Sequence, residues 1–219
     1  MKQLFFLFII LCSSAFYASG QGNHDISTLS LRSGDLLFCG ATSSALSKAI
    51  DESTQTRSNT HFDHMGIVEF SHDSCFVMHA APQKGVCSEP IALFLASDSI
   101  KREVVAYRLK DKFNKSIPTA LRIAHQKIGA NYNYSYRMNS TGYYCSEFIY
   151  ELFAADSVFT LNPMTFKDPS TGQFLPGWID HYAKLGIPIP EGEAGCNPNG
   201  LAASEKLELV GVVRNRADE

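Results

Sequence analysis

The sequence lacks a strong excess of either charge. It has 19 Lys and Arg residues against 22 Asp and Glu residues in 219, which gives a formal net charge of −3 at pH 7. Nucleic-acid-binding surfaces need clustered positive charge, so we expect no nucleic-acid partner. After residue 20 no apolar run is long enough to cross a bilayer, so we expect no stable membrane span. A hydrophobic content of 45% argues instead for a folded globule.

Two common catalytic signatures are also missing. No G-x-S-x-G motif is present to support a serine nucleophile on a strand-to-helix turn. No glycine-rich phosphate-binding loop is present either. These absences argue against a serine hydrolase with that motif and against a nucleotide-binding enzyme with that loop.

The first twenty residues, MKQLFFLFIILCSSAFYASG, have one early lysine, an apolar run and small residues at their end. This pattern predicts a cleaved signal peptide over residues 1–20, and therefore a secreted or periplasmic protein. The remaining residues, 21–219, are long enough for a single domain with a substantial core. They contain five cysteines: Cys39, Cys75, Cys87, Cys145 and Cys196. An odd number leaves at least one thiol free, for which Cys145 is the candidate, and the pairing of the other four stays open.

The chain pattern predicts an α+β domain with strands clustered in the middle. Helices are expected at 43–50, 117–129 and from residue 145 to 153, and Asn162 to Gly200 reads as a long segment rich in Pro and Gly without regular structure. The stretch from residue 188 to 207, which overlaps its end, is expected to form loops beside a cleft or a cover over the sheet. The expected strands are 34–38, 64–70, 75–81, 85–91, 104–109 and 207–214.

Cys145 opens the stretch CSEFIYELF, in which apolar residues recur at helical spacing. A cysteine on an apolar helix face is often a small buried hydrophobe. The first turn of a helix, however, presents free backbone N–H groups and a positive dipole end, both of which favour a thiolate. A nucleophilic cysteine also needs a base, and that base needs an orienting partner.

Two histidines are placed to fill those roles. If Phe70 pairs with Cys75 across the turn SHDS, His79 lies opposite Gly66, and His64 becomes its diagonal neighbour on the same face of the sheet. Gly66 leaves room for both rings. A neutral His79 would orient His64 without adding negative charge to stabilise an imidazolium.

A metal site is the competing interpretation, because HFDH offers His61, Asp63 and His64 with His79 nearby. The spacing at a loop-to-strand junction and the loose ligand count weaken it, so we expect no metal and no other cofactor.

The ordered set GDLLF, HFDHMGIVEF, VMHAAPQKGV and YYCSEFIYELF resembles the YiiX/YebB-like branch of the NlpC-type cysteine hydrolases. The resemblance implies a circularly permuted papain-like fold, with a central antiparallel sheet or half-barrel packed against helices. It also implies that Cys145 is the nucleophile and His64 the general base, with His79 at a position that is often Glu in this branch. Tyr132 corresponds to a tyrosine that helps to hold the oxyanion together with the backbone of Cys145, and Asn133 stands where Asp is usual.

The function implied is that of a secreted cysteine hydrolase that cleaves amide bonds through an acyl-enzyme. Small peptides, N-acyl amino acids or peptidoglycan fragments are the expected substrates. A thioester-forming acyltransferase or a lipid-acyl hydrolase could use the same triad, and a non-catalytic binding module could keep the same fold. The sequence does not separate these alternatives.

Overall fold

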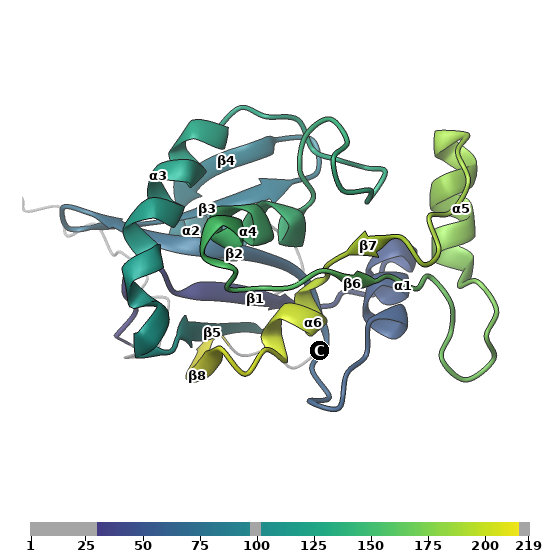
Figure 1. The fold of residues 1–219 in the computed structure, drawn as a ribbon, viewed down its shortest axis with the longest axis horizontal. Coiled ribbons are helices and arrows are strands. Elements are labelled where there is room, and N and C mark those ends of the chain that lie inside the picture. Colours follow the sequence, from purple (N-terminus) through teal and green to yellow (C-terminus); the bar gives the residue numbers. More distant parts are fainter. Residues whose placement is uncertain (1–29, 97–101, 215–219) are drawn as a thin grey trace, which may run out of the picture.

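A six-stranded antiparallel sheet forms the centre of the protein in the computed structural model, which describes residues 30–96 and 102–214 (Figure 1). The spatial order of the strands is β4-β3-β2-β1-β5-β8. Every neighbouring pair is antiparallel. The strands are β1 (Leu36–Gly40), β2 (Phe62–Ser71), β3 (Ser74–Ala81), β4 (Gly85–Pro90), β5 (Val104–Leu109) and β8 (Leu207–Arg214).

Helices cover both faces of this sheet. The helices α3 (Ile117–Lys127) and α4 (Cys145–Phe153) lie across one face, and α2 (Ile91–Ala96) covers β3 and β4 on the other (Figure 1). The helices α1 (Ala45–Ser53) and α5 (Pro176–Leu185) pack together to one side of the sheet. The remaining elements are α6 (Pro198–Ala202), the short pair β6 (Asn162–Pro163) and β7 (Ala194–Gly195), and two 3₁₀ helices, Asp111–Ser116 and Ala154–Asp156.

The predicted elements of the α+β domain are present, with ends shifted by a few residues. The hairpin register is confirmed, because Phe70 pairs with Cys75 and Ile67 with Met78. The part of the chain read as irregular, Asn162 to Gly200, was predicted wrongly, since it contains α5, the start of α6 and the short strands β6 and β7. Pro176 starts α5 with its ring in the first turn, and Gly186 ends it in a left-handed conformation with φ 67°. These residues bound a helix instead of breaking one.

The sheet separates two groups of buried apolar side chains. The larger group contains Met65, Ile67 and the apolar face of α4, including Cys145 and Phe148. The smaller group contains Val68, Val77 and Phe94 on the side of α2. Alternate residues of β2 therefore face different cores, as expected of a strand in the middle of a sheet.

The pairing of β1 with β2 is irregular at one point. Cys39 pairs with His64 but Gly40 pairs with Phe62, so Asp63 is an extra residue in β2. Such a bulge changes which face the following side chains occupy. Phe62 accordingly joins the larger core, whereas His64 lies against Phe94 at the smaller one. The carbonyl oxygen of Asp63 thereby faces Cys145 at the start of α4.

The structure says nothing about the predicted signal peptide, because residues 1–20 lie outside the described residues. Within 30–96 and 102–214, no helix combines the length and apolar character required to span a bilayer. The five cysteines of the described segments are all free thiols.

The start of α4 depends on a buried carboxylate. The backbone N–H of Tyr144 donates to Glu147 Oε2 at 3.1 Å, and Asn133 Nδ2 donates to the same oxygen at 2.9 Å. Burial nevertheless dominates and raises the pKa of Glu147 from its ordinary 4.5 to about 7. The two hydrogen bonds that favour the anion offset only part of the cost of removing it from water.

This raised pKa predicts that the contribution of Glu147 to stability falls as the pH rises. The folded state holds the Glu147 proton more tightly than the unfolded state, so the contribution of this group is greatest below about pH 4.5 and is lost as the pH rises through about 7. We expect the free energy of unfolding in urea of the wild type, taken relative to that of Glu147→Gln, to decrease between pH 5 and pH 8. The exposed Glu52, replaced in the same way, is the control. Equal slopes for Glu147→Gln and the wild type would contradict the argument.

Candidate active site

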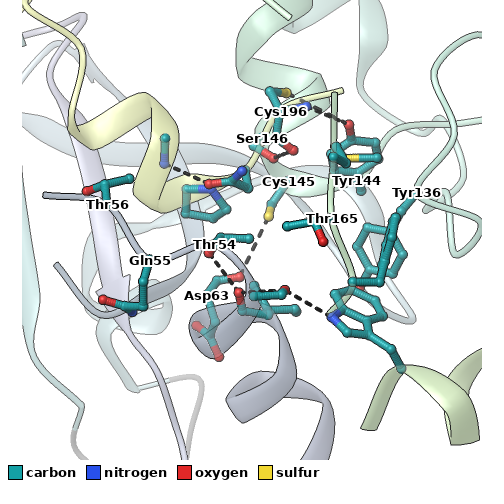
Figure 2. A pocket seen from close by; sticks show the side chains of 18 of the residues that line it. Thr54, Gln55, Thr56, Asp63, Tyr136, Tyr144, Cys145, Ser146, Thr165 and Cys196 are labelled. Atoms are coloured by element: carbon teal, nitrogen blue, oxygen red, sulfur yellow. Dashed lines mark hydrogen bonds between the residues drawn. The ribbon is translucent and has the colours of Figure 1, made fainter. Parts of the chain in front are cut away.

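Cys145 is the first residue of α4, and its side chain is almost completely buried. Its Sγ donates to the carbonyl oxygen of Asp63 at 3.8 Å, and Figure 2 shows it directed toward that residue with Tyr136 and Thr165 nearby. The backbone N–H groups of Ser146 and Met65 also face the sulfur and would stabilise a thiolate. The predicted position of Cys145 at a helix N-terminus is therefore confirmed.

The thiol is protonated in this environment. Burial, followed by the negative charge of Asp63, raises the pKa of Cys145 to about 12, and the two backbone N–H groups oppose only part of that rise. A thiolate is not preformed here, so nucleophilic attack by Cys145 needs a base that removes the proton during the reaction.

His64 and His79 lie side by side on β2 and β3, as the hairpin register predicted. His64 Nε2 is 2.8 Å from His79 Nδ1. His79 Nε2 is 3.1 Å from Glu89 Oε1 on β4, and the other oxygen of Glu89 accepts from Lys84 Nζ at 2.7 Å. The result is one chain of hydrogen bonds, His64–His79–Glu89–Lys84, that crosses three strands.

Both imidazoles are neutral near neutral pH. Burial, then the proximity of His79 and of Arg102, lowers the pKa of His64 well below its usual value of 6.5. Burial also lowers the pKa of His79, although Glu89 partly opposes this effect. Neutral rings accept protons, so the charge state suits a base and its partner.

The geometry assigns a proton to each bond in this chain. A carboxylate only accepts, so His79 Nε2 carries the proton that is shared with Glu89. His79 Nδ1 is then an acceptor, and His64 Nε2 must carry a proton that it donates to His79. The remaining nitrogen of His64, Nδ1, is therefore unprotonated and available as a base.

Cys145 and His64 are not in direct contact, and they lie at different cores: Cys145 belongs to the larger one, and His64 lies against Phe94 at the smaller one. Among the described residues, no hydrogen bond joins them: Cys145 donates to Asp63, the chain neighbour of His64, and the His64 ring lies against Phe94. Two cavities with shared lining residues lie beside them. One is lined by Cys145 and the other by His64 and His79, and both include Asp63, Ile50 and Tyr136 in their walls. The structure thus places the two histidines within hydrogen-bond distance of each other, whereas Cys145 lines the other cavity.

Asp63 was a candidate ligand in the competing metal interpretation. Its carboxylate instead forms an ion pair with Arg102 Nη1 at 2.6 Å and accepts from the Ser47 hydroxyl. His61, the third residue of that ligand set, is mainly exposed and pairs with Asp51 at 3.0 Å. The set His61, Asp63, His64 and His79 therefore does not converge on one point, and the metal interpretation of HFDH was wrong.

Tyr132, the predicted oxyanion donor, lies in the wall of the cavity that contains His64 and His79. Its ring packs against Tyr134 and Tyr136. Burial raises the pKa of Tyr132 well above 10, with a further effect of Tyr136 and Cys145, so its hydroxyl keeps the proton needed to donate. The adjacent Asn133, which stands where an Asp was expected, donates to Glu147 and so connects this loop to the start of α4.

Glu89 is the site residue that sequence reasoning missed. The register of β3 with β4 places His79 opposite Cys87 and Val77 opposite Glu89, so Glu89 is a diagonal neighbour of His79. The turn between Ala81 and Gly85 would have indicated this register by the same reasoning that paired His64 with His79. A second missed contribution comes from α5, whose Trp178 lines the cysteine cavity.

The segment after α5 does lie beside the cleft. Cys196, Asn197, Pro198 and Gly200 line the cavity that contains Cys145. Ser146, the residue after the cysteine, donates its hydroxyl proton to the carbonyl of Cys196 at 3.1 Å. The structure therefore supports the prediction that this segment lies beside a cleft, and not the alternative that it covers the sheet.

Comparison with known proteins agrees with the fold. A family described as "Permuted papain-like amidase enzyme, YaeF/YiiX, C92 family" matches residues 30–211. The crystal structure of the metalloprotein yiiX from Escherichia coli O157:H7 superposes with a TM-score of 0.65 and 19% identity, covering 81% of this chain and 95% of that one. No curated protein matches the chain. The match over residues 30–211 shows that the chain belongs to the permuted papain-like amidase family YaeF/YiiX, and hence to a family of cysteine peptidases and amidases.

Proposed function

We propose that this enzyme hydrolyses amide bonds through an acyl-enzyme on Cys145, with His64 as general base and His79 and Glu89 as positioning residues. The single observation that carries the proposal is the hydrogen-bond chain Glu89–His79–His64, which leaves His64 Nδ1 unprotonated next to the strand segment that touches Cys145. A non-catalytic binding module would have no need for that chain.

The first step is transfer of the thiol proton. His64 Nδ1 takes the proton from Cys145 Sγ as the sulfur attacks the carbonyl carbon of the amide, which forms a tetrahedral intermediate. Because the two residues do not touch in the structure, this transfer needs a rearrangement that brings His64 Nδ1 within reach of the sulfur, directly or through water. Catalytic hydrogen bonds in substrate-free enzymes are often long and shorten when substrate binds.

The negative charge on the substrate oxygen needs donors near Cys145. The backbone N–H of Cys145, at the start of α4, and the hydroxyl of Tyr132 are the proposed donors. His64 then gives its proton to the leaving amine, and a water activated by the same nitrogen hydrolyses the thioester.

The cavity beside Cys145 supports a substrate with an apolar group. Its volume is about 220 Å³. Its wall includes Trp178, Phe166, Tyr136 and Met164, and Asp63 is the charged side chain among the described lining residues. An apolar side chain of a small peptide, or the acyl chain of an N-acyl amino acid, matches this lining better than a charged group does. Peptidoglycan fragments with an apolar residue at the scissile bond fall in the same class.

We place this reaction outside the cytoplasm, in the periplasm or in the secreted fraction. The support is the signal-peptide pattern of residues 1–20.

Replacing the nucleophile should abolish turnover without unfolding the protein. Cys145→Ala removes the only atom that can form the acyl-enzyme, so we expect kcat/KM for a model amide to fall by on the order of 10³-fold or more. Cys75→Ala, at a half-buried thiol on β3, is the control and should keep its activity. If Cys145→Ala remains active, or if its loss of activity matches a loss of folded protein measured by circular dichroism, Cys145 is a core residue and not the nucleophile.

His64 and its partner His79 should differ in how much activity their variants retain. His64→Ala should lower kcat/KM by on the order of 10²–10⁴-fold, the usual contribution of a general base, whereas His61→Ala should have little effect. His79→Gln should retain more activity than His79→Ala, because the amide oxygen can still accept from His64 Nε2. A purely structural role for His79 would give equal losses in Gln and Ala variants of equal stability.

The apolar cavity predicts a dependence on chain length. Each CH₂ group moved from water into an apolar wall contributes about 0.8 kcal/mol, which is about fourfold in kcat/KM. We expect that increase per CH₂ in one of two series of amides, lengthened on the acyl side or on the amine side, until the cavity is full. Flat responses in both series, or a preference for a charged group, would contradict this assignment of substrate class.

A further inference from the structure

Three metal-binding side chains of different kinds converge next to the proposed catalytic residues. His79, Cys87 and Glu89 each offer one ligand atom, and these atoms lie within 4.8 Å of one another. His79 and Cys87 are paired across β3 and β4, and Glu89 is two residues further along β4 on the same face. We propose that these three residues form a binding site for a thiophilic divalent cation such as Zn²⁺, and that its occupancy switches off His64 as a base.

The donor set suits zinc. A thiolate, an imidazole and a carboxylate are its usual protein ligands, and three such ligands with a water in the fourth position make a common tetrahedral site. Zinc bonds of about 2.0–2.3 Å put ligand atoms roughly 3–4 Å apart, so small side-chain rotations on neighbouring strands would complete the site. A thiolate and a carboxylate together balance the charge of the cation.

The surroundings allow a cation to enter. Cys87 is half-buried, whereas His79 and Glu89 are buried. Lys84, which pairs with Glu89 at 2.7 Å, is the nearby positive charge that opposes binding, but its side chain is 53% exposed and can turn into water. The Cys87 side thus provides the entrance and a place for the water ligand.

Occupancy would reverse the direction of the hydrogen bonds. The cation would take the lone pair of His79 Nε2, so the proton now shared with Glu89 must leave that nitrogen. A neutral His79 would then carry its proton on Nδ1 and donate it to His64 Nε2, which becomes an acceptor. His64 would still carry one proton, now on Nδ1 instead of Nε2. Neither ring changes its charge, and the proton released to solvent is that of the Cys87 thiol.

This reversal removes the base. In the metal-free state, His64 Nδ1 has a lone pair for the thiol proton, whereas in the metal-bound state the same nitrogen carries a hydrogen. The inhibitory effect rests on the proposed function, since it requires His64 to act as the base. The cation site itself does not depend on it.

The site can be tested without any enzyme assay. Full-length Cys145→Ala protein, used so that the catalytic thiol cannot contribute, is titrated with Co²⁺ under reducing conditions and monitored for the thiolate-to-cobalt absorption band. We expect the band in this background and with Cys75→Ser added, and its loss with Cys87→Ser. Glu89→Gln, which keeps the size of the side chain, should weaken Co²⁺ binding by at least about tenfold. An unchanged band in Cys87→Ser, or equal Co²⁺ affinity in Glu89→Gln and in its parent, would overturn the site.

The switch is tested by the ratio of activities with and without Zn²⁺ within each protein. We expect Zn²⁺ to inhibit the wild type and Cys75→Ser at the concentration that fills the site, and Cys87→Ser to resist inhibition by at least tenfold in Zn²⁺ concentration. Equal inhibition of Cys87→Ser would show that Zn²⁺ acts elsewhere, for example on Cys145 directly. A filled site without inhibition would overturn the switch and leave the cation site standing. A protein that binds Co²⁺ as expected but has no amidase activity would count against the proposed function alone.

Discussion

The antiparallel register of β2, β3 and β4 is the constraint on which the candidate site depends. It brings His64, His79 and Glu89 to one face of three neighbouring strands, where they form a continuous chain of hydrogen bonds. Gly66 is part of this constraint, since a Cβ at that position would lie 2.6 Å from Val77 Cγ1 and 3.1 Å from His79 Cβ. A side chain there would displace His79 from its partner. A slip of one residue would send the same side chains to the opposite face.

The position of Cys145 reflects a balance between packing and reactivity. The apolar face of α4 fixes the helix against β2 and β3, which places Cys145 and the buried Glu147 in its first turn. The same burial raises the pKa values of both groups to about 12 and about 7. A preformed thiolate is thereby excluded, and the chemistry depends on a base and on backbone N–H groups. A site of this kind keeps the thiol protonated until a substrate is in place.

Much of this site follows from local sequence. The SHDS turn sets the register of the hairpin, and the register alone brings His64 to His79; the helical period places Cys145 at the start of α4. The turn between Ala81 and Gly85 carries equivalent information for Glu89, because it sets the register of β3 with β4. Two features were beyond such reasoning. The bulge at Asp63 and the wall contributed by α5 and the segment around Cys196 arise from contacts between residues far apart in the sequence.

Glu89 also changes the role of His79, the third residue of the proposed triad of Cys145, His64 and His79. Read from the sequence, His79 could orient His64 but could add no negative charge to stabilise its protonated form. In the structure a carboxylate is present one strand further out, 3.1 Å from His79 Nε2. When His64 gains a proton, His79 Nδ1 accepts from the imidazolium while its Nε2–H remains directed at Glu89, so the ring is polarised between a cation and an anion. Hydrogen bonds in such chains strengthen one another in a medium of low dielectric constant. The carboxylate found directly next to the base in many triads is thus displaced by one imidazole here, and its influence reaches His64 through the bond that also fixes the tautomer.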